Sequence, residues 1–94
     1  MRALETFHHT FSEAGTHTFD LGKKPCSVLV KNMTSGDIKF SLGNEIDTTH
    51  DSYSKMKKDT FEIFNYIVWD NSATASATIE ASAAGDVEIR ILGY

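Results

Sequence analysis

Short segments rich in β-branched and aromatic residues recur along the whole chain, and turn residues separate them. No segment has the sustained spacing of an amphipathic helix, so the crossover helices of a parallel sheet are missing. The expected strands are 5–11, 16–21, 26–32, 37–43, 60–69, 74–82 and 87–92, with a short one at 52–56. The sequence therefore predicts a single all-β domain over residues 1–94, an antiparallel, jelly-roll-like β-sandwich of seven to eight short strands.

Two pairs of neighbouring segments are expected to form hairpins. In the first, segments 5–11 and 16–21 gather their apolar residues on one face, with these side chains directly opposite across the ladder: Phe7, His9 and Phe11 against His17, Phe19 and Leu21. In the second, segments 26–32 and 37–43 are joined by the turn MTSG. Residues 44–59 are polar and charged, which predicts a crossing loop.

The stretch FEIFNYIVWD, residues 61–70, is apolar on both sides of the predicted strand. One side packs on the opposite sheet, and the other needs separate cover. The loop 44–59 is too polar to be a good lid, so a neighbouring subunit is the favoured cover. The alternative is a central strand with the loop packed on it. The predicted interface residues are Phe64, Tyr66, Val68 and Trp69.

Charge and cysteine content bear on the partners. The net charge of −4 argues against nucleic acid, because phosphate binding requires a clustered excess of Lys and Arg. The lone Cys26 cannot form an internal disulfide. Residues 1–15 lack the apolar core of a signal peptide, and no apolar run is long enough to cross a bilayer. We therefore expect synthesis in a reducing cytoplasm and no membrane partner.

No pattern of a catalytic or metal site is evident. His9 and His17 could approach on one face, with His50 and Asp47 or Asp51 adding ligands from the loop, but His8 must point to the opposite face. The spacing of a cupin metal site is absent, and Cys26 has no histidine near it in sequence. The carboxylates Glu45 and Asp47 lack an apolar wall. We expect no enzyme activity, no metal and no cofactor.

Aromatic residues beside Asp70 and Asn71 suggest an alternative function. Aromatic rings flanked by Asp and Asn are typical of carbohydrate sites and also of ordinary sandwich rims. The rim is the favoured interpretation, and a carbohydrate- or receptor-binding module is the alternative. The candidate platform residues are Tyr53, Tyr66, Trp69 and Tyr94.

Two runs, SVLVKNMTSGDIKFSLG and AGDVEIRILGY, resemble segments of the small all-β virion proteins of tailed bacteriophages. The first resembles a strand–turn–strand unit with the pattern V-x-V-x-N-x-(T/S)-x-G-D-I, and the second resembles a closing strand. Together they cover about half of the chain and contain no catalytic motif. The resemblance implies a capsid decoration or head/tail accessory protein in the virion, made in the bacterial host cytoplasm. Such proteins commonly form homo-oligomers and bind other virion proteins of the capsid or tail.

Overall fold

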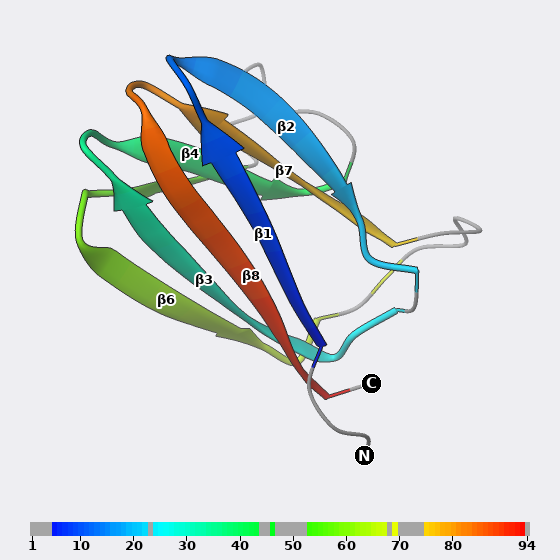
Figure 1. The fold of residues 1–94 in the computed structure, drawn as a ribbon. Helices are drawn as coiled ribbons and strands as arrows, with labels where there is room; N and C mark the ends of the chain where they lie inside the picture. The colour runs from blue at the N-terminus through cyan, green and yellow to red at the C-terminus, as the bar shows by residue number, and fades with distance from the viewer. Residues whose placement is uncertain are drawn as a thin grey trace.

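The computed structural model describes residues 5–22, 24–43, 46, 53–67, 69 and 75–93. Its strands are β1 (Glu5–Phe11), β2 (Gly15–Asp20), β3 (Ser27–Thr34), β4 (Ile38–Leu42), β5 (Ser54–Met56), β6 (Thr60–Asn65), β7 (Ser76–Ala81) and β8 (Gly85–Gly93). They form two antiparallel four-stranded sheets with the orders β1-β8-β3-β6 and β2-β7-β4-β5, packed as a sandwich (Figure 1). The predicted all-β antiparallel sandwich is confirmed. The described residues include no helix long and apolar enough to cross a membrane.

The chain changes sheet at nearly every connection, and β4–β5 is the exception, since these two strands pair. Both predicted hairpins are therefore wrong. β1 pairs with β8, whereas β2 pairs with β7; β3 pairs with β6 and β8, whereas β4 pairs with β5 and β7. The apolar faces still meet, but they meet across the interior of the sandwich. A hairpin and an arch between sheets have the same alternating pattern, which explains the error.

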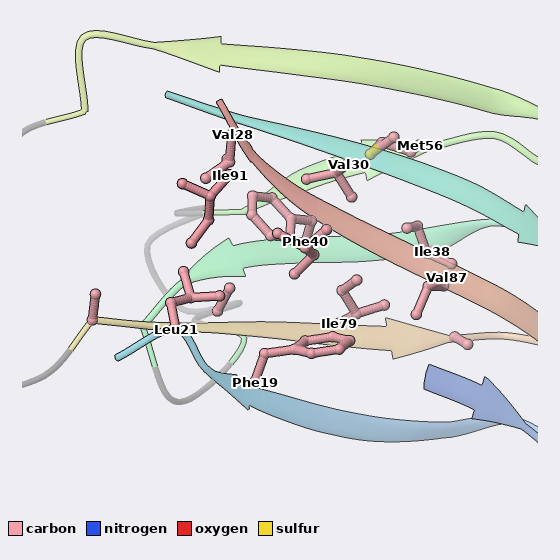
Figure 2. Packing of buried hydrophobic residues seen from close by; sticks show 14 of the residues in the cluster. Phe19, Leu21, Val28, Val30, Ile38, Phe40, Met56, Ile79, Val87 and Ile91 are labelled. Atoms are coloured by element: carbon pink, nitrogen blue, oxygen red, sulfur yellow. The ribbon is translucent and has the colours of Figure 1, made fainter. Parts of the chain in front are cut away.

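The core lies between the inner faces of the two sheets. Val28 and Val30 of β3 and Ile91 of β8 face Phe40 of β4 and Ile79 of β7, and all five are buried (Figure 2). Full burial of each such side chain contributes about 1.5–3 kcal/mol. The core therefore uses apolar residues from both sheets, as the alternating pattern of these segments requires.

The short connections β1–β2, β3–β4, β5–β6 and β7–β8 gather at one end of the sandwich (Figure 1). Asn32 is fully buried there, and its Nδ2 donates to the carbonyl oxygens of Gly36 at 2.9 Å and Met56 at 3.2 Å. Its Oδ1 accepts from the backbone N–H of Thr34 at 3.0 Å and from the Thr34 hydroxyl at 2.6 Å. The N-x-T-x-G part of the quoted phage-like run thus forms a hydrogen-bonded turn between sheets.

Candidate functional site

Strand β6 is an edge strand of the first sheet, and among the described residues it pairs with β3 alone. Of its six residues only Phe64 is partly buried, and the other five are exposed. Phe64 points inward, where its ring lies 5.1 Å from the ring of Phe40 and packs against the core. Phe61 and Ile63 point outward and keep 64% and 46% of their surface exposed. The edge strand therefore presents two large apolar side chains to solvent.

Residues of β3 extend this apolar surface. The register places Ile63 beside Leu29 and Phe61 beside Lys31, so the outer faces of β3 and β6 are continuous. Met33 follows on the outer face of β3 and is 46% exposed. We call Leu29, Met33, Phe61 and Ile63 the β3–β6 strip. Exposed apolar residues gathered on neighbouring strands are typical of an interaction surface.

A cluster of charged residues borders the strip on the outer face of β8 and β1. Glu88 is buried, and its carboxylate oxygens lie 3.6 Å from His8 Nδ1, 3.6 Å from Lys31 Nζ and 3.1 Å from Arg90 Nη2. A buried carboxylate needs such partners. The register of β3 and β6 places one of them, Lys31, beside Phe61. The outer face of the first sheet thus changes from apolar at its β6 edge to charged toward β1.

The three predicted interface residues that the structure describes do not share one exposed surface. Phe64 was expected on the uncovered side of its strand, and this placement is wrong, because it packs on the core. Tyr66 is 93% exposed. Trp69 packs against the core, and its indole Nε1 donates to the carbonyl oxygen of Pro25 at 2.7 Å. Val68 lies outside the described residues.

A change of backbone at Tyr66 explains this difference. The strand ends at Asn65, and Tyr66 has a φ of 58°, in the left-handed region. The alternation therefore cannot continue to Trp69. Sequence reasoning missed Phe61 and Ile63 as the exposed pair, although the alternation of β6 puts them on the side opposite Phe64. The sequence pattern did not indicate that β6 lies at a sheet edge, because the position of a strand in a sheet depends on distant strands.

The outer face of the second sheet holds a groove of about 610 Å³. Its lining includes two positive and two negative residues: Lys39 and Glu80, whose Nζ and carboxylate oxygen lie 3.5 Å apart, and Lys55 and Asp37. The ring of Tyr53 lies nearby, 5.4 Å from the Lys39 ammonium and 6.0 Å from that of Lys55. The groove thus has no concentrated charge of either sign.

Of the candidate platform residues, Tyr53 lies beside β4 and β5, whereas Tyr66 follows β6 in the other sheet. The Trp69 indole is engaged by the core and by Pro25. Tyr94 lies outside the described residues. The residues that the structure describes therefore assemble no aromatic platform from this set.

The histidines are placed partly as predicted. His9 and His17 do approach each other, with parallel rings whose centroids lie 3.7 Å apart, but they do so between the sheets and not across a ladder. His8 points to the opposite face of β1, toward Glu88. His50 lies outside the described residues. The nitrogen lone pairs of each imidazole lie in the plane of its ring. Because the two rings are stacked in parallel planes, their lone pairs do not point at a common ion.

No group of three or more histidine, cysteine or acidic residues with metal-binding geometry occurs in the part of the chain that the structure describes. Cys26 is a free, half-buried thiol. Among the described residues, the β3–β6 strip is therefore the strongest candidate site.

Comparisons with known proteins identify no relative of this chain. No protein-family model matches the chain, and no significant similarity is found to a curated protein or to a solved structure.

Proposed function

We propose that this protein is a structural component of a bacteriophage particle, a capsid decoration or head/tail accessory protein that binds copies of itself and other virion proteins. The observation that carries the proposal is the β3–β6 strip at an open sheet edge, where Phe61 is 64% exposed and Ile63 46%. The resemblance of the runs at 27–43 and 84–94 to phage virion proteins supports it.

We also propose that the sandwich is a jelly roll. The sheet orders β1-β8-β3-β6 and β2-β7-β4-β5 agree with two interleaved Greek keys. Jelly rolls build many viral capsid domains, which supports the structural role by analogy. They also build lectin domains, but the described candidates for a sugar platform, Tyr53, Tyr66 and Trp69, lie apart or pack against the core.

Self-association through β6 joins two copies edge to edge. In the described part of the chain, no strand pairs with the second side of β6, so its backbone N–H and C=O groups can continue the sheet into a second copy. A two-fold axis perpendicular to the sheet keeps the two outer faces on the same side. The strips of both copies then form one continuous apolar surface, in which neighbouring side chains across the new ladder shield part of each other from water.

Charge selects the register of this pairing. The β6 strands of the two copies can pair in two antiparallel registers that use nearly all of the strand. In both, a side chain that points outward in one copy lies opposite an outward side chain of the other copy. One register centres on Glu62 and opposes two carboxylates directly, which is unfavourable. The other centres on Ile63 and places Phe61 opposite Asn65 of the second copy. The second register is therefore the one we propose.

Cysteine cross-linking tests the register. In a Cys26→Ser background, Ile63→Cys places two thiols directly opposite, at the Cα separation of about 5 Å that a disulfide accepts. The matched variant Phe61→Cys separates its thiols by four residues along the ladder, about 13 Å. Oxidation is expected to yield a dimer of the first variant and not of the second. Cross-linking of Phe61→Cys alone contradicts the proposed register.

Light scattering at high concentration tests the association itself. The unmodified protein is expected to show concentration-dependent oligomers, and Phe61→Lys with Ile63→Lys is expected to abolish them while the circular dichroism spectrum is kept. Thr6→Lys, on the outer face of the opposite edge strand, is the control and retains association. A strict monomer would overturn self-association through this edge. The phage assignment is tested separately by the neighbouring genes, which are expected to encode capsid, portal or tail proteins.

A further inference from the structure

The stacked pair His9–His17 joins the two sheets at the side formed by β1 and β2. His9 lies on the inner face of β1 and His17 on the inner face of β2, with ring planes 9° from parallel. Phe11 meets the His9 ring edge-on at 4.6 Å, and Phe19 meets the His17 ring edge-on at 4.7 Å. Four aromatic rings therefore close the gap between the two edge strands.

In the described part of the chain, the inner faces around this pair carry no opposite charge. Val87 of β8 lies opposite His9, and Ile79 of β7 lies opposite His17. Phe7 and Phe11 flank His9 along β1, and Phe19 follows His17 along β2. Among the described residues, the nearby charged groups are directed elsewhere or lie farther along the chain: Glu5 at the far end of β1, Glu13 in the β1–β2 turn, and Asp20, Glu80, Asp86 and Glu88 off the inner faces.

We propose that the His9–His17 stack is a pH-sensitive latch, which holds β1 and β2 together while both imidazoles are neutral and loosens this side of the sandwich on acidification. Neutral rings can stack, whereas two imidazolium ions at this separation repel each other. The repulsion acts between two edge strands in different sheets, each hydrogen-bonded on one side in the described structure. Edge strands held in this way are the parts of a fold that open locally at least cost.

The titration of His17 supports the latch. Burial, and after it the charge of His9, lowers the pKa of His17 below its ordinary value of 6.5. The unfolded chain therefore takes up a proton near pH 6.5, while the folded chain resists protonation until a lower pH. Stability from this site is complete above pH 6.5 and is lost as the pH falls from there toward the folded-state pKa.

Hydrogen exchange measured by mass spectrometry tests the latch. Peptides from β1 and β2 are expected to exchange roughly tenfold faster at about pH 5.5 than at about pH 7.5, after correction for intrinsic exchange, while peptides from β3 change little. The double variant His9→Phe with His17→Phe keeps aromatic rings without charge and is expected to lose this response. His8→Gln, on the outer face of β1, is the matched control and is expected to keep it.

An equal response in the double variant, a uniform response over all strands, or no response in the unmodified protein would overturn the latch. If the double variant fails to fold, the proposal is tested instead by NMR titration of His17 in the single variant His9→Phe and in the unmodified protein. The pKa of His17 is expected to be lowered in the unmodified protein and to rise when His9 is replaced. A His17 titration that is unaffected by His9 would likewise contradict the proposal.

Discussion

The ring of Phe64 lies 5.1 Å from the ring of Phe40, so the edge strand β6 of one sheet is packed against β4 of the other. This contact determines which side of β6 faces solvent. With Phe64 inside, the alternation of the strand places Phe61 and Ile63 outside, where they form the β3–β6 strip with Leu29 and Met33. One aromatic contact in the interior thus determines the composition of the candidate interaction surface.

Phe64→Ala is expected to lower the free energy of unfolding by about 2–4 kcal/mol, because it removes a ring that packs on the core. Phe61→Ala, on the same strand, is expected to change it by less than about 1 kcal/mol, because its ring faces solvent. Urea denaturation of both variants measures the difference. Equal losses would mean that the assigned orientation of β6 is incorrect.

Gly85→Ala is expected to destabilise the turn between β7 and β8 strongly. Gly85 has a φ of 136°, and an added Cβ would lie 2.5 Å from the Cα of Thr34. Gly22→Ala is the control, since Gly22 also has positive φ, at 74°, but an added Cβ meets nothing within 4 Å. Thermal unfolding should show a cost of about 1–2 kcal/mol at Gly22 and a clearly larger one at Gly85. A similar cost at both positions would show that the contact with Thr34 relaxes easily.

Asn32→Ala is expected to cost about 2–3 kcal/mol, since the backbone carbonyls of Gly36 and Met56 lose a buried donor and Thr34 loses an acceptor. Ser35→Ala, in the same turn, is a milder control because the hydroxyl of Ser35 makes an exposed hydrogen bond to Ala84. Chemical denaturation gives both values. A loss at Asn32 no greater than that at Ser35 would argue against a structural role for this buried network.

Trp69→Phe is expected to cost about 1 kcal/mol, because phenylalanine keeps an aromatic ring but cannot donate to the Pro25 carbonyl. Tyr66→Ala is expected to leave stability nearly unchanged, since Tyr66 is 93% exposed. Denaturation curves and light scattering together separate a role in the fold from a role in association. Loss of association in Trp69→Phe with unchanged stability would return Trp69 to the candidate interface.

The residues of FEIFNYIVWD show how much of the structure the local alternation of apolar residues can predict. Their apolar content on both sides predicts one strand with two faces to cover, but β6 ends at Asn65, and Phe64 is the one apolar residue on its inner side. The pattern also leads to the error at Phe64, because a period of two assigns two sides without saying which one is inside. At Tyr66 the left-handed backbone ends the alternation, and Trp69 reaches the core by a separate path.

The order of residues along this chain by itself determined the β class, the antiparallel sandwich and most strand positions, because alternation and turn residues act over a few neighbours. Tertiary structure alone decided that β1 and β2, and likewise β3 and β4, belong to opposite sheets, and that β6 lies at an edge. Both outcomes depend on which distant strands supply hydrogen-bond partners. That choice is made by the packing of the whole domain, and a short stretch of sequence does not contain it.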